Sequence, residues 1–420
     1  MEYKKYEKDN YNIHLINTNR FKGMSIVVFL TKKFDKKDLV FGNVLSANLV
    51  YTTKKYNTKN EIAAKGEELY GTKISSSFGV SGKCESFVFS LDFLNPKYTD
   101  EKYLSESLDF LCEVLFNPNV ENNEFHNDYF NIIMNDKIAQ VESVKDNPSL
   151  FASIEYGKIM YKGTPTEYSS IPTLEELKKV NPKNLYEFYQ TLFTGNYNID
   201  IAIFGETEES VVELVDSKFK HIKGTKEKLR FDIEHKYEDK VEEKIDSLPF
   251  NQSKLYVGYR LNDITYHELH HVLKVYNTIL GTMNDSILFN IVREENSLCY
   301  SISSYISRYN PALTIYAGIN KSNYEKTLTL IKECVELMKD RKTLERLFDS
   351  AKKTINTYLN NYYDDLSSQI NRYYNAEYTE TEDVETLRKN INEVTIEEVI
   401  EINKKISLAT IYLLKGDNND

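Results

Sequence analysis

The sequence has no tryptophan and only four cysteines among its 420 residues. Cys84, Cys112, Cys299 and Cys334 are scattered, without the C-x-x-C spacing of a metal knuckle or a redox pair, so we expect reduced thiols in the core. No stretch approaches the roughly 20 apolar residues that a membrane helix needs. The N-terminus also lacks the apolar run of a signal peptide. We therefore expect a cytoplasmic protein that does not span a membrane.

An excess of positive charge is lacking as well. The chain carries 64 acidic and 53 basic side chains, which gives a formal net charge of -11 at pH 7. Nucleic-acid surfaces need clustered Lys and Arg, whereas the basic residues here are interleaved with acids. This pattern excludes nucleic acid as a main partner. The length exceeds what one hydrophobic core ordinarily serves, which predicts two or more domains.

Landmarks of the first half of the chain recur in the same order in the second half. Two capping boxes, each a Thr with a Glu three residues later at the start of a helix, lie 222 residues apart, and so do two cysteines on apolar helices. Each half also closes on an apolar, β-rich strand followed by Gly and an acid. The paired landmarks are Thr173 with Glu176 and Thr395 with Glu398, Cys112 and Cys334, and Gly205 and Gly416. This self-similarity predicts an internal duplication.

Charged residues dominate the segment between the two halves, residues 221–246. Few apolar side chains are available there to build a core, so we interpret the segment as a linker. Each half contains a block of strands and a block of long helices, which is typical of layered α+β folds. We therefore predict an α+β protein with two homologous α/β halves, residues 1–220 and 247–420, joined by this charged linker.

The string HELHH at residues 267–271 matches the H-E-x-x-H pattern of zinc metalloproteases. In that pattern His267 and His271 would bind the metal, and Glu268 would deprotonate a metal-bound water. On a helical wheel, however, the apolar stripe of this helix faces away from both histidines, which predicts a solvent-exposed face. A zinc site also needs a third ligand; Glu294 or Glu295 could be proposed, but their spacing does not select them over other acids.

One segment of the second half resembles the insulinase-like metallopeptidases, the family of pitrilysin and the mitochondrial processing peptidase. It reads NTILGTMNDSILFNIVREENSLCYSISS, residues 277–304. In the family this segment is a Leu-Gly turn, a Ser-x-Leu helix, an Arg-Glu pair and a Leu-x-Tyr. The matching residues are Gly281, Ser286, Leu288, Arg293, Glu294, Leu298 and Tyr300. Together with the duplicated halves and the linker, the resemblance covers nearly the whole chain.

The zinc motif of that family is the inverted H-x-x-E-H, on a first-half helix that precedes a Lys-Tyr pair. If residues 55–56 are that pair, the motif positions fall on Asn43, Ser46 and Ala47. Neutral Asn is a poor zinc ligand, Ser has no carboxylate to act as a general base, and Ala has no donor atom. The family's third ligand, a Glu upstream of Asp-x-Pro, falls on Gln140. The resemblance therefore implies that this chain holds no catalytic zinc or other cofactor.

The second half retains the family's Arg and Tyr, at Arg293 and Tyr300, which in the family reach across the chamber to the bound peptide. A forked, permanently charged Arg and a Tyr hydroxyl both suit a peptide carbonyl on which negative charge develops. The resemblance implies a non-catalytic, zinc-less subunit that shapes the peptide chamber and lends both side chains to a homologous, zinc-bearing partner in a heterodimer. Two alternatives stay open: a scaffold without a peptidase role, and a zinc hydrolase that uses His267 and His271.

Overall fold

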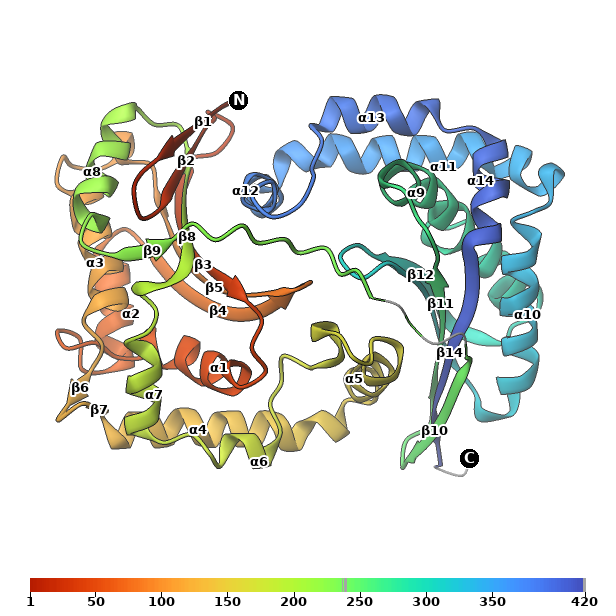
Figure 1. The fold of residues 1–420 in the computed structure, drawn as a ribbon, viewed down its shortest axis with the longest axis horizontal. Helices are drawn as coiled ribbons and strands as arrows, with labels where there is room; N and C mark the ends of the chain where they lie inside the picture. Colours follow the sequence, from red (N-terminus) through yellow and green to blue (C-terminus); the bar gives the residue numbers. More distant parts are fainter. Residues whose placement is uncertain (236, 238–239, 418–420) are drawn as a thin grey trace. The chain divides into compact units, whose positions relative to one another are not determined.

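The computed structural model describes residues 1–235, 237 and 240–417 (Figure 1). Within it the chain forms two compact units, each assembled from three separate segments. Unit 1 consists of Met1–Glu142, Ser169–Phe231 and Leu366–Thr379, and unit 2 consists of Ser143–Tyr168, Asp232–Asp365 and Glu380–Asp420. The predicted division into 1–220, 221–246 and 247–420 concerns a duplication in the sequence, and it stays a prediction.

Unit 1 is built on a seven-stranded mixed sheet in the order β1-β2-β8-β3-β5-β4, with β9 paired to β8. Strand β8 runs parallel to β2 and β9, and the other neighbours are antiparallel. The strands are β1 (Glu2–Glu7), β2 (Asn12–Asn17), β3 (Gly23–Lys33), β4 (Lys73–Ser81), β5 (Cys84–Leu94), β8 (Thr194–Gly205) and β9 (Lys223–Thr225). Every residue of β3 from Met24 to Thr31 is buried, as expected for a central strand covered on both faces.

Helices pack on the sheet of unit 1, and a small hairpin of β6 (Val120–Glu121) and β7 (Glu124–Phe125) lies among them. The helices are α1 (Asp38–Leu49), α2 (Lys59–Glu68), α3 (Tyr103–Phe116), α4 (Asn127–Glu142), α6 (Leu174–Leu177), α7 (Pro182–Tyr189), α8 (Glu209–Phe219) and α12 (Leu366–Asn375), with the 3-10 turn η1 (Pro96–Tyr98). Helix α1 packs against β4, α4 and α7, and its Val44, Leu45 and Leu49 side chains are fully buried.

Unit 2 is built on a five-stranded sheet in the order β10-β14-β11-β13-β12. The strands are β10 (Glu242–Leu248), β11 (Ser253–Leu261), β12 (Cys299–Ser307), β13 (Ala312–Ile319) and β14 (Ile406–Gly416). The helices are α5 (Pro148–Met160), α9 (Leu273–Asn277), α10 (Tyr324–Leu337), α11 (Arg341–Asn361), α13 (Val384–Glu393) and α14 (Ile396–Ile402). Three segments are π-helical, η4 (Glu268–Val272), η5 (Thr278–Thr282) and η6 (Phe289–Glu295). The 3-10 turns are η2 (Ser143–Asp146), η3 (Pro165–Glu167), η7 (Lys321–Asn323), η8 (Tyr362–Asp364) and η9 (Asn403–Lys405).

The two sheets share one strand topology. In unit 1 the order β2-β8-β3-β5-β4 has one parallel pair, β2 with β8, followed by three antiparallel pairs. In unit 2 the order β10-β14-β11-β13-β12 likewise has one parallel pair, β10 with β14, followed by three antiparallel pairs. Both capping boxes that the sequence predicts are formed, before α6 and before α14. The predicted fold class, α+β with two homologous halves, is confirmed.

One helix of unit 1 comes from late in the chain, between the α11 and α13 helices of unit 2. Helix α12 brings Tyr374 against the sheet, where its ring stacks on Phe29 with 3.9 Å between ring centres. The Tyr374 hydroxyl lies 2.6 Å from the Thr31 hydroxyl and 2.8 Å from the Ser86 hydroxyl. These are buried contacts with β3 and β5, so unit 1 is complete only with this late segment.

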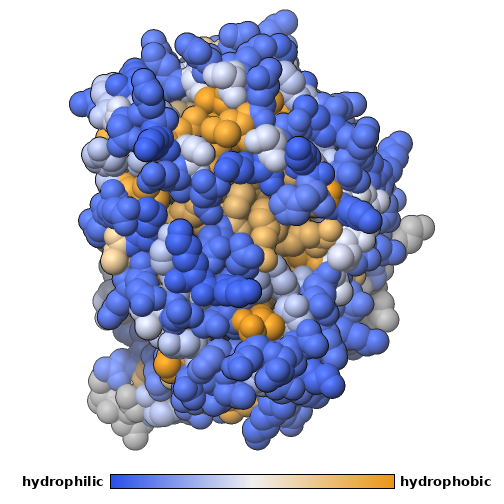
Figure 2. All heavy atoms as spheres, turned by 90° about the vertical axis from the view of Figure 1, so that its left-hand side faces the viewer, coloured by the Kyte–Doolittle hydropathy of each residue, from blue (hydrophilic) through white to orange (hydrophobic). Residues whose placement is uncertain are grey.

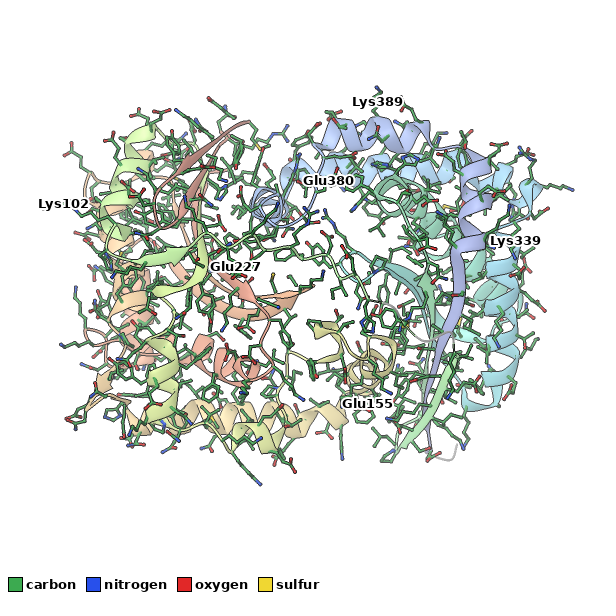
Figure 3. The ribbon with its side chains drawn as sticks, viewed as in Figure 1. Lys102, Glu155, Glu227, Lys339, Glu380 and Lys389 are labelled. Atoms are coloured by element: carbon green, nitrogen blue, oxygen red, sulfur yellow. The ribbon has the colours of Figure 1, made fainter. Side chains whose placement is uncertain are left out.

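Unit 2 has the reverse arrangement, because its helix α5 comes from early in the chain. The buried Tyr156 hydroxyl of α5 lies 2.7 Å from the Thr314 hydroxyl of β13. Glu155 of α5, labelled in Figure 3, pairs with Lys244 of β10 at 2.8 Å. Two segments, 143–168 and 366–379, are therefore exchanged between the stretches of sequence that build most of each unit.

The surface and the helices give two further facts. On the face of the molecule shown in Figure 2, hydrophilic side chains predominate and hydrophobic ones lie in several separate patches. Among the residues that the structure describes, no helix combines the length and the apolar character needed to cross a membrane.

Candidate functional site

The three predicted zinc-motif positions lie together on helix α1, and none of them presents a metal donor set. The Asn43 amide donates to the backbone oxygen of Ser170 at 2.8 Å. Its own amide oxygen is buried and has no hydrogen-bond partner among the described residues. The Ser46 hydroxyl donates to the Asn43 backbone oxygen at 3.1 Å, within the same helix. Ala47 contributes only a methyl group, so this helix does not fit the catalytic zinc that the H-x-x-E-H motif of the family binds.

The fourth position, Gln140, lies at the end of helix α4, which packs against α1. Its side chain is exposed and is an amide, which lacks the charge of the family's Glu ligand. The space beside α1 is also occupied. A methyl group placed on Gly42 would lie 2.5 Å from the ring of Phe78 on β4, so this ring packs directly on the helix backbone next to Asn43.

Arg293 lies on η6 of unit 2, and its side chain is 42% exposed. Its guanidinium group lies 4.7 Å from the centre of the Phe289 ring, a cation–π contact that supports the side chain. Glu294 approaches the Arg293 Nε at 3.8 Å. A residue with positive φ, Ser297 at 54°, ends the helix and leads the chain into β12. The Arg293 guanidinium thus keeps donors available on the surface of unit 2.

Tyr300 lies on β12, the edge strand of the sheet of unit 2. The pairing of β12 with β13 shifts between Cys299 and Ser301, which leaves Tyr300 as the extra residue of a bulge. A bulge redirects the side chain that it carries, and Tyr300 is 66% exposed. The structure therefore places Arg293 and Tyr300 on consecutive elements of one unit, both accessible, with Tyr300 on the strand that ends the sheet order.

The two histidines of the HELHH string face each other. The Nδ1 atoms of His267 and His271 are 2.9 Å apart. The Nε2 of His267 lies 2.9 Å from a carboxylate oxygen of Glu398, and the Nε2 of His271 lies 2.7 Å from one of Glu382. The candidate ligands Glu294 and Glu295 are not among these partners.

The prediction that both histidines lie on a solvent-exposed face is wrong for His271. Its side chain is 3% exposed, whereas that of His267 is 47% exposed. The helical wheel assumed 3.6 residues per turn, but η4 is a π-helix, in which hydrogen bonds join residue i to residue i+5. This wider turn, together with the segment that carries Glu382, places His271 inside unit 2.

Glu268 is not placed as the general base of a zinc hydrolase. Its carboxylate accepts hydrogen bonds from the backbone N (2.8 Å) and the hydroxyl (3.0 Å) of Thr265, and it pairs with Lys405 at 2.7 Å. Burial tends to raise the pKa of Glu268, but the bonds from Lys405 and Thr265 outweigh it and hold that pKa below its usual value. A carboxylate held in this way caps a helix. In residues 1–235, 237 and 240–417, no group of three or more His, Cys, Asp and Glu side chains is arranged to hold a metal ion.

Sequence reasoning missed a buried network in unit 1. A carboxylate oxygen of Asp200, on β8, lies 3.1 Å from His14 Nε2 and 2.9 Å from the Asn12 amide nitrogen, and the other accepts from the Tyr378 hydroxyl at 2.5 Å. The Tyr3 hydroxyl lies 2.9 Å from His14 Nδ1. Nothing in the spacing of these five residues indicates that they meet, because they come from three distant parts of the chain.

Comparisons with known proteins find relatives that are described as inactive. A family profile described as the peptidase M16 inactive domain matches residues 179–355. The probable inactive metalloprotease YmfF of Bacillus subtilis (strain 168) is 27% identical over 411 residues, covering 96% of this chain and 95% of its own. The uncharacterized zinc protease YmxG of the same organism is 21% identical over 255 residues, 60% of each chain.

Solved structures share the fold. A conserved protein from Enterococcus faecalis V583 superposes with a TM-score of 0.90 at 24% identity, covering 98% of this chain and 97% of its own. The peptidase M16 inactive domain from Pseudomonas fluorescens superposes with a TM-score of 0.80 at 19% identity over the whole of both chains.

Proposed function

Because this chain belongs to the insulinase-like (M16) peptidase family as an inactive member, we propose that it serves as the non-catalytic half of a two-chain peptidase. In this proposal the chain contributes one wall of the peptide chamber, and Arg293 and Tyr300 reach the substrate held at a partner's metal. The partner is a homologous chain that carries H-x-x-E-H. The observation that carries the proposal is the contrast within the molecule: helix α1 lacks zinc donors, while Arg293 and Tyr300 are exposed on one unit.

The chemistry of the two side chains supports this role. A peptide carbonyl gains negative charge when it is attacked, and donors that are already in place stabilise that charge without reorganising. The Arg293 guanidinium supplies forked, charged donors and rests on the Phe289 ring. The Tyr300 hydroxyl is directed outward by the bulge in β12.

A cytoplasmic location is part of the proposal. All four cysteines are unpaired, and three of them, Cys84, Cys299 and Cys334, are buried. Burial raises the pKa of the Cys112 and Cys334 thiols to about 12, so these thiols are protonated and unreactive at neutral pH. Free core thiols suit a reducing compartment.

Co-expression with the zinc-bearing homologue from the same genome tests the proposal. We expect a one-to-one complex on size exclusion, and peptide cleavage by the complex but not by this chain alone. Within the assembled complex, Arg293→Ala and Tyr300→Phe should each lower turnover by roughly 10- to 1,000-fold, the range for loss of one oxyanion donor. Zinc content and complex formation should be unchanged, and the two losses should be less than additive because both residues hold one substrate segment.

Two matched variants serve as controls. Tyr358→Phe removes a hydroxyl from a tyrosine of unit 2 that is 60% exposed, close to the exposure of Tyr300. Arg346→Ala removes an exposed arginine from α11 of the same unit. Both should cleave at the wild-type rate. Wild-type cleavage by a complex that carries both Arg293→Ala and Tyr300→Phe would contradict the proposal and favour a scaffold without a peptidase role.

A further inference from the structure

A chain of four side chains crosses the helix that begins with η4. It runs from Glu398 to His267, then to His271 and Glu382, with distances of 2.9, 2.9 and 2.7 Å between the facing atoms. Glu382 is held in turn by the Asn390 amide, which donates to its second oxygen at 2.9 Å. Glu398 is held by the capping box that begins α14, where its second oxygen accepts from the Thr395 backbone N at 2.7 Å. Both carboxylates are therefore fixed before they meet the imidazoles.

The distances within this series of four side chains indicate which ring nitrogens carry protons. A carboxylate accepts hydrogen bonds, so the Nε2 atoms that face Glu398 and Glu382 carry protons. Each neutral ring then presents an unprotonated Nδ1, and these two lone pairs face each other at 2.9 Å. Two lone pairs at that distance repel unless a positive charge lies between them. A shared third proton or a metal ion supplies that charge.

The arrangement is the one that metal-binding histidines adopt. A ligating imidazole characteristically donates its other N–H to a carboxylate, which fixes the ring and makes the coordinating nitrogen more basic. Both rings here have such a carboxylate. Metal–nitrogen bonds of about 2.0–2.1 Å around a tetrahedral ion require the two Nδ1 atoms to separate by only a few tenths of an ångström. The 47% exposure of His267 leaves water access to the remaining coordination positions.

We propose that His267 and His271 form a two-histidine site for a divalent transition-metal ion, coordinated through both Nδ1 atoms and completed by water. Imidazole nitrogen favours Cu²⁺, Ni²⁺ and Zn²⁺ over Mg²⁺ and Ca²⁺, which prefer oxygen. The site binds an ion and does not hydrolyse peptides, because Glu268 is bound to Thr265 and Lys405. It also does not depend on the proposed peptidase partner.

The four side chains around this site come from three parts of unit 2. His267 directly precedes η4, His271 lies within η4, and Glu398 belongs to α14. Glu382 lies in the segment between α12 and α13, two residues after Glu380, which Figure 3 labels. Binding should therefore stabilise unit 2 by the usual linkage between ligand affinity and unfolding.

Titration of the tag-free chain with Cu²⁺ and with Zn²⁺ tests the site. We expect one equivalent to bind, with a paramagnetic resonance spectrum of two coupled imidazole nitrogens for Cu²⁺ and an increase in melting temperature for both ions. His267→Gln, at the exposed ring, and the double variant with His271→Gln should abolish this equivalent.

Two further variants separate a built site from a surface histidine. Glu382→Gln keeps one acceptor oxygen where two are used and removes the charge, so it should weaken binding by about 10- to 100-fold, as loss of a carboxylate behind a ligand does. His270→Gln is the matched control, because this ring belongs to the same helix but packs against Tyr266, with ring centres 4.2 Å apart. It should bind as the wild type does. Equal binding by the wild type and by the folded His267→Gln chain overturns the proposal, as does absence of binding to the wild type.

Discussion

Strand β3 of unit 1 and strand β11 of unit 2 are each followed by a helix at the same place in the fold. The two helices carry different side chains. In unit 1 it is α1, where the motif positions carry an amide, a hydroxyl bonded to its own helix, and a methyl group. In unit 2 it is the helix that begins with η4, where two imidazoles face each other and each meets a carboxylate. Helix α1, which matches the family's zinc position, has no zinc donors. Its counterpart in unit 2 carries two nitrogen donors that face each other.

The difference shows that a motif is defined by the partners of its side chains as much as by its letters. Glu268 occupies the general-base position of H-E-x-x-H, yet it caps its own helix and binds Lys405. The carboxylates that do meet His267 and His271 follow more than 100 residues later in the chain. Substitutions placed at equivalent positions of the two units can break or sharpen this comparison.

The largest difference in the free energy of unfolding is expected between a substitution in strand β8 and one in strand β14. In the first register pair of the parallel ladder, β8 has Asp200 opposite Asn12, and β14 has Thr410 opposite Glu242. Asp200→Ala leaves His14 and the Tyr378 hydroxyl buried without their acceptor, so it should destabilise unit 1 by about 3–5 kcal/mol. Thr410→Ala in unit 2 should cost no more than about 1–2 kcal/mol. Urea unfolding with hydrogen exchange to separate the units measures both.

The pH dependence provides a control for Asp200. Burial alone would raise its pKa, but hydrogen bonds from His14, Tyr378 and Asn12 outweigh burial and lower that pKa. A carboxylate with a lowered folded-state pKa stabilises the fold above its unfolded pKa, and this stabilisation is lost as the pH falls through the folded value. The gap between wild type and Asp200→Asn should therefore be constant at neutral pH and close under acid. A gap that persists unchanged in acid would contradict the assignment.

Two glycines test how closely each helix approaches its sheet. A methyl group on Gly281 would lie 2.9 Å from the backbone N of Ser304, which the edge strand β12 cannot move freely. The nearest atoms to a methyl group on Gly42 would be those of the Phe78 ring, at 2.5 Å. Gly281→Ala should destabilise unit 2 by about 1–3 kcal/mol through overpacking. Gly42→Ala should cost less, because the ring can shift and alanine favours helix by about 1 kcal/mol. Melting temperatures in the reverse order would show that Phe78 is the more rigid neighbour.

Glu85, a buried acid of unit 1, should make the stability of this unit fall as the pH rises. Burial raises the pKa of Glu85 to about 8, although the Asp35 backbone N–H and Lys32 oppose the shift. One of its oxygens has no hydrogen-bond partner among the described residues. The folded state therefore favours the protonated form, and stability is lost as the pH rises from the usual Glu value toward 8. Glu85→Gln should gain about 1–3 kcal/mol over the wild type at pH 8 and little at pH 5, measured by urea unfolding. An equal gain at both pH values would rule out titration as the cause.

The smallest expected effects concern the two capping boxes. Thr173 and Thr395 each accept a hydrogen bond from the backbone N of a Glu three residues later, at 3.2 Å in both cases. Thr173→Ala and Thr395→Ala should each cost about 1 kcal/mol, as loss of a helix N-cap usually does. Only Thr395→Ala should also alter metal binding, because Glu398 contacts His267. Unequal thermal shifts in metal-free buffer would mean that the two boxes are not equivalent.

Patterns among residues close in sequence predicted the fold class. They could not predict contacts between residues that are far apart in sequence. Both capping boxes and the closing strands could be predicted because their residues are neighbours in sequence. The burial of His271 was not, because it depends on a π-helical turn and on Glu382, 111 residues away. The outward direction of Tyr300 depends on a bulge that the sequence does not mark. The hydrogen bonds of Asp200 could not be predicted either, because its partners come from both ends of the chain.

The late origin of helix α12 has a consequence for synthesis on the ribosome. The sheet of unit 1 is translated by Phe231, but Tyr378, which completes the hydrogen bonds of Asp200, follows only after the strands of unit 2 from β10 to β13. At 5–20 residues per second, that interval lasts about 7–30 seconds. During this time the nascent sheet exposes Phe29, Thr31 and Asp200, the surface that Tyr374 and Tyr378 later cover. A chaperone that holds emerging chains would find its binding surface there, and α12 with the residues that directly follow it would displace the chaperone.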